Sequence, residues 1–550
     1  MKTRAELEQE NAKIQGELSQ IRQQLLEKES ALEQQEVVID QKNVTIGQKD
    51  AFIDQLKEAL ILARNRKFAA TTESLRSLQS EIFNESEDSA DAFEAASDSS
   101  LQDIDTIVVH THQRKRGGRK PLPEELPRIE VIHDLTDDEK VCPHGHGLKH
   151  IGDKVSEQLD VIPMQIQVIQ HRRKQYTCPC CEGYLKTASK PKQPIEKSQA
   201  SAGLLAYIAV SKYADSLPLY RQSTILSRFG IEMDRTTLAN WMIRCGQLVQ
   251  PLINRIEERL HTAPYLHVDE TTVQVLNEAG KPAQSTSYMW VRSGTPPGGA
   301  PSDTGPLGRR LILFDYDPSR SGTVPQRLLA DYDGAIMVDG YGGYDAVCRE
   351  QRIVRLGCWA HARRKFVEAS KIAKKKKNTR ADYALKQIAR LYQLEKQIGN
   401  DAPSEIGSGA IADYRYQQRQ EKALPILEKL KAWLDQAQTE VAPKTALGKA
   451  LYYLQHQWPR LIRYLDDGRY PIDNNPVENA IRPFAVGRKN WLFSTSVRGA
   501  KASANLYSLI ETAKASGVEP YAYLKHVFAA LPNITDYDGV DRLLPDIVND

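Results

Sequence analysis

The chain lacks any apolar run that approaches the ~20 residues needed to span a bilayer, so we do not expect a membrane protein. Its N-terminus also lacks the apolar core of a secretion signal. Cysteine is scarce: there are seven among 550 residues, and three of them lie within 178–181. This odd, clustered set argues against a secreted disulfide scaffold. It favours metal binding in a reduced compartment, so we expect a cytoplasmic protein.

Net charge is nearly absent as well, but the formal value of +3 conceals acidic and basic blocks that cancel. A length of 550 residues is too great for one hydrophobic core and predicts three to five folding units. We therefore expect a multidomain protein with all-α and α/β parts.

Residues 1–66 predict one long helix with a coiled-coil seam, because apolar residues recur at a spacing of seven: Leu18, Leu25, Leu32, Ile39, Ile46, Ile53 and Leu60. The second core position is weaker midway, where it holds Lys28, Gln35, Lys42 and Lys49. The alternative is a helix packed on its own globular domain. We favour a homo-oligomer, because the positions off the seam are rich in glutamine and charge.

Residues 67–125 are predicted to be a linker whose charge changes sign. The acidic, serine-rich stretch 81–105 has the composition of a disordered segment. The following stretch, 114–121, is basic and contains two glycines, so it can lie close to DNA and neutralise phosphates. Its candidate DNA-binding residues are Arg114, Arg116, Arg119 and Lys120. A solvated basic linker is an equally good interpretation.

Residues 126–190 predict a small β unit that binds structural zinc. Two clusters of soft ligands flank a strand-like stretch, as in zinc knuckles. Cys178 and Cys181 have Cys-x-x-Cys spacing, and Cys142 with either His144 or His146 would complete four ligands. Buried free thiols are the alternative, but four ligands in two clusters favour zinc.

Residues 191–262 are predicted to be helical. One helix ends at Gly230, and the next begins after Asp234 as N-cap, with Arg235 in its first turn. Two helices joined by a glycine turn resemble a helix-turn-helix, so Arg235 is a candidate DNA contact. Most such pairs are simply packed hairpins.

From residue 263 the periodicity changes to that of strands. The order is three strands, helix, strand, helix, strand and helix, which is typical of a ribonuclease-H-like domain. We place its first part at 263–373 and its last part at 471–535, followed by a tail at 536–550. Between them, 374–470 predicts a helical insertion that begins with a lysine run, which could line a nucleic-acid channel or be a solvated face.

Three acidic residues are placed as a polynucleotidyl-transfer site requires: Asp269 and Asp339 after strand-like runs, and Glu478 at a helix start. Such carboxylates can hold two Mg²⁺ or Mn²⁺ ions, which clamp the attacking and leaving oxygens of a phosphoryl displacement. Each acid also has an ordinary explanation. Asp269 or its neighbour Glu270 could be a turn or cap residue, Asp339 could end a strand in a turn, and Glu478 could complete a capping box.

Several stretches resemble the insertion sequence 66 family of bacterial transposases across nearly the whole chain. They begin at His267 (His-Val-Asp-Glu-Thr), Asp339 (Asp-Gly-Tyr-Gly-Gly-Tyr), Gly357 (Gly-Cys-Trp-Ala-His-Ala-Arg-Arg-Lys-Phe), Asp473 (Asp-Asn-Asn-Pro-Val-Glu-Asn-Ala-Ile-Arg-Pro) and Gly487 (Gly-Arg-Lys-Asn-Trp-Leu-Phe). The upstream order of zipper helix, basic segment, cysteine knuckle and helices is also similar. The first knuckle departs from the family pattern, since Cys-Pro-His-Gly-His stands where a Cys-x-x-Cys is common.

The resemblance implies a DDE transposase in which Asp269, Asp339 and Glu478 bind the metal ions for cleavage of element ends and strand transfer into target DNA. It implies that Cys358 and His361 match a Cys-x-x-His signature, a possible structural pair, and that small accessory proteins can accompany the enzyme. Arg488 and Lys489, about three helical turns after Glu478, are candidate phosphate contacts or ordinary surface charge. Two other functions stay open: a nuclease of this fold without strand transfer, and a non-catalytic DNA-binding regulator.

Overall fold

The computed structural model describes residues 164–177, 185–297, 309–372, 379–402 and 408–547, and a few isolated positions before residue 131. The chain divides into two compact units, residues 99–189 and the rest. In the smaller unit the described residues include an antiparallel strand pair, β1 (Gln175–Thr177) and β2 (Leu185–Thr187), which flanks the predicted knuckle at 178–181. Among all the described residues, no helix is long and apolar enough to cross a bilayer.

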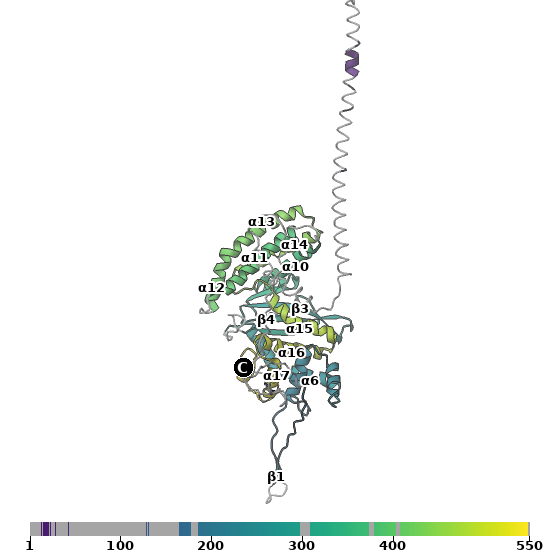
Figure 1. Ribbon diagram of the computed structural model, residues 1–550, viewed down its shortest axis with the longest axis vertical. Helices are drawn as coiled ribbons and strands as arrows, with labels where there is room; N and C mark the ends of the chain where they lie inside the picture. Colours follow the sequence, from purple (N-terminus) through teal and green to yellow (C-terminus); the bar gives the residue numbers. More distant parts are fainter. Residues whose placement is uncertain are drawn as a thin grey trace, which may run out of the picture. The chain divides into compact units, whose positions relative to one another are not determined.

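A mixed sheet lies at the centre of residues 190–550 (Figure 1), with the strand order β5-β4-β3-β6-β7. The first three strands are antiparallel, and β6 and β7 run parallel to β3. A short strand, β8, extends the pairing of β3 at its far end. The strands are β3 (Tyr265–Asn277), β4 (Thr286–Gly294), β5 (Leu311–Asp317), β6 (Ala335–Val338), β7 (Val354–Gly357) and β8 (Ser494–Ser496). The predicted succession of three strands, helix, strand, helix, strand and helix is therefore present.

Helices pack on the sheet from segments before, within and after it. Those before it are α4 (Ala202–Tyr213), α5 (Leu219–Ser227), α6 (Arg235–Leu248) and α7 (Gln250–Leu260). Those between its strands and after β7 are α8 (Thr323–Leu328), η1 (Gly342–Tyr344), α9 (Asp345–Glu350) and α10 (Trp359–Ile372). The C-terminal ones are α15 (Asn475–Trp491), α16 (Val497–Ala515), α17 (Pro520–Ala530), η4 (Leu531–Asn533) and α18 (Tyr537–Asp541). Helix α15 lies across β3 and β4, so it reaches the centre of the sheet.

The outer edge of β5 is covered by α16. The hydroxyl of Ser508 accepts a hydrogen bond from the backbone N–H of Phe314 at 2.8 Å and does not donate one to β5. Thr512 accepts the N–H of Ile312 at 3.0 Å and donates to its carbonyl at 3.1 Å. An uncovered strand edge invites pairing with other chains, and these two hydroxyls satisfy its polar groups within the fold.

The segment predicted as a helical insertion is helical and has its own hydrophobic cluster. It comprises α11 (Arg380–Asn400), α12 (Ser408–Gln418), the π-helix η2 (Arg419–Ala423), α13 (Leu424–Glu440), α14 (Ala446–Leu461) and η3 (Ile462–Leu465). Helix α10 packs against α11 and α14, which joins this cluster to the end of the sheet (Figure 1).

The predicted helix pair corresponds to α5 and α6. Gly230 has φ +75°, the left-handed conformation that a glycine turn requires. Asp234 is the N-cap of α6, as predicted, although its side chain makes no capping hydrogen bond. The far end of α6 packs closely on α16, because a Cβ at Gly246 would lie 2.6 Å from the Cα of Ala502. Arg235, at the other end of α6, is exposed.

Candidate functional site

Asp269 lies on β3, and Asp339 directly follows the neighbouring parallel strand β6. The pairing of β3 with β6 joins Tyr265 to Ala335 and His267 to Met337, an offset of 335 − 265 = 70 residues. Asp269 and Asp339 have the same offset, 339 − 269 = 70, so continuing the register by two residues sets them side by side. Adjacent strands are ~4.8 Å apart, and paired residues point to the same face of a sheet.

Strand β3 does not end at Asp269, which corrects the expectation that this residue closes a strand. The strand continues to Asn277, because 270–274 pairs with β4 in a long hairpin and Val275 and Asn277 pair with β8. Asp269 and Glu270 are therefore neither turn residues nor helix caps. Asp339 does follow the last residue of β6, and its Oδ1 accepts the N–H of Tyr341 at 2.8 Å, as in a turn. A turn role for Asp339 is thus compatible with its place beside Asp269.

Glu478 lies in the first turn of α15 and is 4% exposed. Because Asn474 is the N-cap, Glu478 is the fourth helical residue and does not complete a capping box, which corrects that alternative. Its Oε2 accepts a hydrogen bond from Arg364 at 3.3 Å. Its Oε1 is buried, has no hydrogen-bond partner among the described residues, and lies 3.6 Å from Nδ1 of His361. A buried carboxylate oxygen without a donor is costly unless something else satisfies it.

Asn474, which the sequence analysis did not single out, connects the start of α15 to two strands. Its amide donates to the carbonyl of Val268 at 3.0 Å, and its Oδ1 lies 3.0 Å from Nδ1 of His267. Its backbone N–H donates to Sγ of Cys358, which directly follows β7, at 3.3 Å. Asn474 is fully buried, so these bonds fix where α15 begins relative to Asp269. Asn474 belongs to the stretch starting at Asp473 that contributes to the family resemblance, so the sequence did contain a signal for this residue.

The carboxylates influence one another electrostatically. Burial, followed by the charges of Glu270 and Glu478, raises the pKa of Asp269 well above its usual value, and Asp339 adds to the effect. Burial lowers the pKa of His361, although Glu478 and Asp339 oppose this shift. Like charges that are buried together favour protonation or a bound cation. The cluster of Asp269, Asp339 and Glu478 therefore favours a bound cation.

Glu270, which follows Asp269 on β3, belongs to a separate hydrogen-bond network. Its Oε2 accepts a hydrogen bond from Tyr344 at 2.8 Å, and its Oε1 accepts one from Arg320 at 2.7 Å. Burial raises the pKa of Glu270, although Tyr344 and Arg320 oppose the shift. Both of its oxygens have protein donors, so Glu270 is less available to a cation than Glu478.

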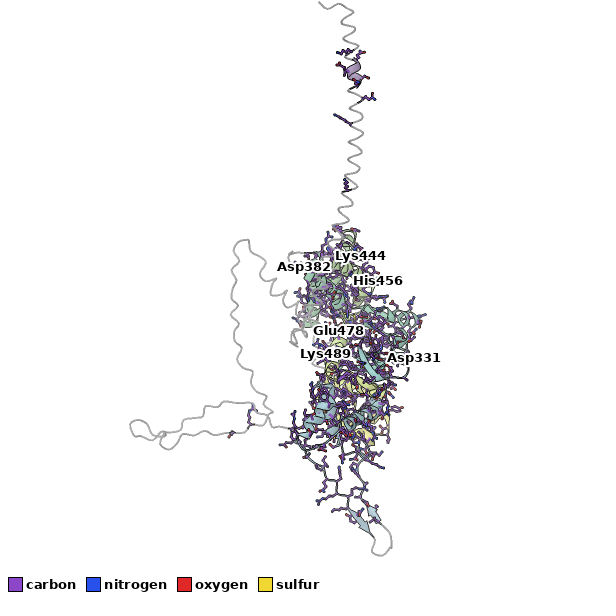
Figure 2. The ribbon with its side chains drawn as sticks, turned by 90° about the vertical axis from the view of Figure 1, so that its right-hand side faces the viewer. Asp331, Asp382, Lys444, His456, Glu478 and Lys489 are labelled. Carbon is purple, nitrogen blue, oxygen red and sulfur yellow. The ribbon has the colours of Figure 1, made fainter. Side chains whose placement is uncertain are left out.

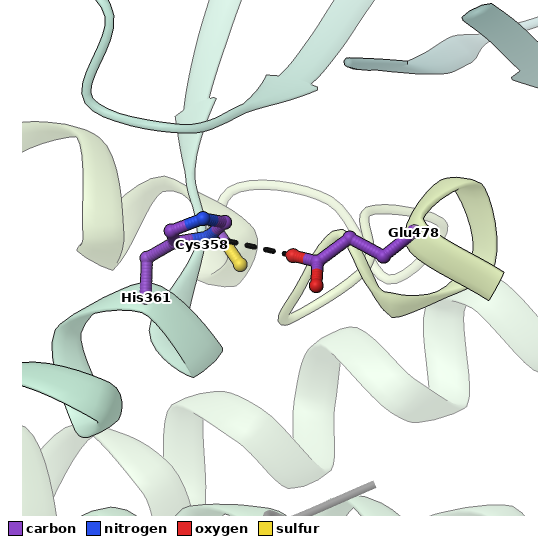
Figure 3. Close-up of side chains that lie close together, drawn as sticks. All are labelled: Cys358, His361 and Glu478. Carbon is purple, nitrogen blue, oxygen red and sulfur yellow. Dashed lines mark ion pairs between the residues drawn. The ribbon is translucent and has the colours of Figure 1, made fainter. Parts of the chain in front are cut away.

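Cys358, His361 and Glu478 bring one ligand atom each to within 4.8 Å of one another (Figure 3). Burial raises the pKa of Cys358 well above its usual value, and its sulfur accepts backbone N–H groups of Asn474 and His361. The sulfur is thereby held between the first turn of α10 and the start of α15. Cys358 therefore fits a structural role, whereas His361 faces the open oxygen of Glu478.

The donor chemistry of the cluster fits divalent cations. Mg²⁺ and Mn²⁺ prefer carboxylate oxygens, and Mn²⁺ also accepts imidazole. Asp269, Asp339 and Glu478 would hold such ions, because they supply negative charge and one buried oxygen that has no donor.

The remaining predicted residues are spread along the chain. Arg488 lies in the last turn of α15, where its guanidinium donates to Thr271 and Thr272 of β3. Lys489 is exposed beside it. The other predicted positions lie outside the described residues: Arg114, Arg116, Arg119, Lys120, Cys142, His144, His146, Cys178, Cys181 and the lysine run 374–377. Most of 1–66 does too, although its described positions are helical and Leu18 is 48% exposed.

Four family profiles match the sequence. The profile described as "Transposase IS66 family" matches residues 197–502, which include all three carboxylates. "Zinc-finger binding domain of transposase IS66" matches 139–182, "IS66 C-terminal element" matches 508–545, and "Transposase C of IS166 homeodomain" matches 55–131.

Relatives of similar length occur in Sinorhizobium fredii (strain NBRC 101917 / NGR234). The uncharacterized protein y4jD is 33% identical over 435 residues, which cover 77% of this chain and 81% of that protein. The uncharacterized protein y4qI is 33% identical over 431 residues, or 77% of this chain and 75% of that protein. The uncharacterized protein y4hP is 30% identical over 439 residues, or 78% and 76% of the two chains.

Proposed function

This chain belongs to the IS66 family of transposases, and from that membership we propose that Asp269, Asp339 and Glu478 are its catalytic carboxylates. As a DDE transposase it is a polynucleotidyl transferase that carries out DNA transposition. The observation that supports the assignment best is Glu478: a buried carboxylate with an oxygen that lacks a donor, whose charge acts on Asp269. The same residues would hold two Mg²⁺ or Mn²⁺ ions.

When bound, divalent cations supply Lewis-acid stabilisation of the attacking and leaving oxygens in cleavage at the element's end and in joining to target DNA. The protein's own contribution is positioning. Two observations support this proposal: the register of β3 and β6 predicts that Asp269 and Asp339 are neighbours, and Asn474 ties the start of α15, where Glu478 lies, to β3. Arg364 holds one oxygen of Glu478 and so orients the other. Preorganised charge of this kind needs little rearrangement during the reaction.

DNA would be held by residues on several segments. Arg488 and Lys489 extend from the same helix as Glu478, and Arg235 is exposed at the start of α6. Arg114, Arg116, Arg119 and Lys120 would contact the backbone of the element ends. Cys142, Cys178 and Cys181 with His144, or His146 in its place, would bind structural zinc, in line with the zinc-finger profile at 139–182. The seam in 1–66 would pair two subunits, and accessory proteins could join them.

The assignment is tested with pre-cleaved duplexes of the element's ends, the full-length protein, and Mg²⁺ or Mn²⁺. We expect joined products with the native protein and none with Asp269→Asn. Asp331→Asn is the matched control. The substitution makes the same chemical change at an exposed residue outside the carboxylate cluster. Joining by Asp269→Asn at the native rate would refute the carboxylate assignment. Cleavage of intact end duplexes by the native protein, without joining of the pre-cleaved ones, would identify a nuclease.

A further inference from the structure

A cavity of about 330 Å³ lies where the β3–β4 hairpin meets the end of α15, on the two elements that also carry Asp269 and Glu478. Its lining includes Gln274, Gln284, Thr286, Arg488, Lys489 and Leu492. A cavity of about 150 Å³ already holds benzene, so this one has room for a nucleobase. Figure 2 labels Glu478 and Lys489, which come from the two ends of α15.

The cavity carries positive charge that no carboxylate neutralises. Within the described residues, neither Arg488 nor Lys489 forms an ion pair, and the hydrogen bonds of Arg488 go to the neutral groups of Thr271 and Thr272. Arg488 is half-buried, and burial lowers its pKa. A partly desolvated guanidinium without an acidic partner is suited to an anion such as phosphate.

The rest of the lining suits a base. Amide and hydroxyl groups of Gln274, Gln284 and Thr286 can donate to and accept from the edge of a nucleobase. The amide of Gln274 is fixed, because it donates to the carbonyl of Ala283 at 2.9 Å. Leu492 adds an apolar surface on which a base can pack.

Leu492, which supplies this apolar surface, lies in a strained turn. Leu492 has φ 64° and ψ −51°, and the N–H of Phe493 donates to the carbonyl of Trp491 at 2.8 Å. This is a γ-turn with positive φ, a rare and strained form, and strain of this type concentrates at functional sites. Leu492 is 62% exposed and Phe493 is 40% exposed. Exposed leucine and phenylalanine side chains next to cations can act as wedges between DNA bases.

The distance to the carboxylates corresponds to a few nucleotides. Thr272 to Gln274 follow Asp269 on β3 by three to five residues, or ~10–17 Å at ~3.3 Å per residue. Arg488 follows Glu478 on α15 by 488 − 478 = 10 residues, or ~15 Å at 1.5 Å per residue. With ~3.4 Å of rise per nucleotide, the cavity is roughly three to five nucleotides from the carboxylates.

We propose that this cavity binds one unstacked nucleotide of the DNA strand that the carboxylates process, roughly three to five positions from the scissile phosphate. Leu492 and Phe493 separate the base from its neighbour, the polar lining receives the base, and Arg488 with Lys489 binds its phosphate. The inference rests on the proposed function, because that function places a DNA strand at Asp269.

The test uses a duplex of the element's end in which single thymidines around the cleavage site are replaced in turn by 4-thiothymidine. The duplex is irradiated with the full-length protein without divalent metal, and crosslinked peptides are identified by mass spectrometry. We expect crosslinks from one or two adjacent positions to residues within 272–286 or 488–493. Crosslinks confined to other segments would overturn the proposal.

A second measurement follows the emission of 2-aminopurine at the same positions, which rises when a base unstacks. Leu492→Gly removes the apolar wedge and relieves the positive φ, so the variant should fold. We expect it to lower the emission increase by about fivefold, while Tyr452→Ala, which trims an exposed aromatic on α14, leaves the increase intact. An unchanged increase in Leu492→Gly would exclude the wedge.

The charge is tested with Lys489→Glu against Lys501→Glu, an exposed lysine on α16. We expect about a tenfold loss of crosslinking at the cavity for the former and little loss for the latter. Normal crosslinking without strand transfer would refute the proposed function but not this inference. Normal strand transfer without crosslinks at the cavity would refute the inference alone.

Discussion

Glu395 and Glu478 are both largely buried glutamates on helices, with side chains 11% and 5% exposed, yet their surroundings are opposite. Both oxygens of Glu395 accept hydrogen bonds from Arg419 at 2.8 Å, and Arg415 adds another at 3.2 Å. Arg419 is itself fully buried in the π-helix η2. Glu478 instead keeps one oxygen without a donor and lies beside other acids.

The pKa shifts follow this difference. Burial alone raises the pKa of Glu395, but Arg419 and Arg415 outweigh burial and hold it below its usual value. Beside Glu478, burial raises the pKa of Asp269 well above its usual value, and the charges of Glu270 and Glu478 raise it further. Under the proposed function, charge that stabilises the fold is paired within the chain, whereas charge that binds a ligand is left open.

The largest expected effect comes from neutralising the open cluster. Glu478→Gln and Asp269→Asn should each lower strand transfer by at least about a thousandfold, because several kcal/mol of transition-state stabilisation by the metal site would be lost. In metal-free protein, Asp269→Asn should not destabilise the fold. A raised folded pKa means that the ionised group costs stability at neutral pH. Strand-transfer assays and urea unfolding measure the two effects, and a strongly destabilised Asp269→Asn would contradict the comparison.

The opposite result is expected at the paired cluster. Arg419→Met should cost about 3–5 kcal/mol of unfolding free energy, because it leaves Glu395 buried without its main partner. It also removes the donors to the carbonyls of Tyr464, Asp467 and Tyr470. Urea unfolding measures the loss.

The control for that variant is Arg469→Met, whose exposed ion pair with Asp467 should contribute less than about 1 kcal/mol. The double variant Arg419→Met with Glu395→Gln should recover part of the loss, because no buried charge then lacks a partner. Equal losses for Arg419→Met and Arg469→Met would show that burial does not separate the two pairs.

The two clusters also differ in how far sequence predicts them. The strands of the sheet followed from short apolar runs, and the order of Asp269, Asp339 and Glu478 indicated a shared site. The local sequence pattern could not predict contacts between distant segments. Asn474 bonds to Val268, which is 206 residues away in the sequence, and Arg364 bonds to Glu478, which is 114 residues away. The hairpin that extends β3 past Asp269 depends on pairing with β4, and the role of Arg419 depends on carbonyls that are 45, 48 and 51 residues away in the sequence.

A divalent cation should stabilise the open cluster and not the paired one. At a concentration a hundredfold above its Kd, a ligand adds about 2.7 kcal/mol to unfolding, which raises Tm by about 2–4 °C in domains of this size. We expect this shift with Mg²⁺ or Mn²⁺ in native protein and in Asp331→Asn, measured by calorimetry. Its persistence in Glu478→Gln would place the cation elsewhere.

The smallest effect concerns acidification and the paired cluster. Because the folded pKa of Glu395 is lowered, its contribution is present above the unfolded value of about 4.3 and is lost as pH falls through the folded pKa. The difference in unfolding free energy between native protein and Glu395→Gln should therefore be constant from pH 7 to about pH 5 and shrink below that. Glu421→Gln is the control, since Glu421 is exposed in the same π-helix and should show no such trend. A difference between native protein and Glu395→Gln that grows on acidification would mean that Arg419 and Arg415 do not hold Glu395 ionised, and the contrast with Glu478 would lose its electrostatic basis.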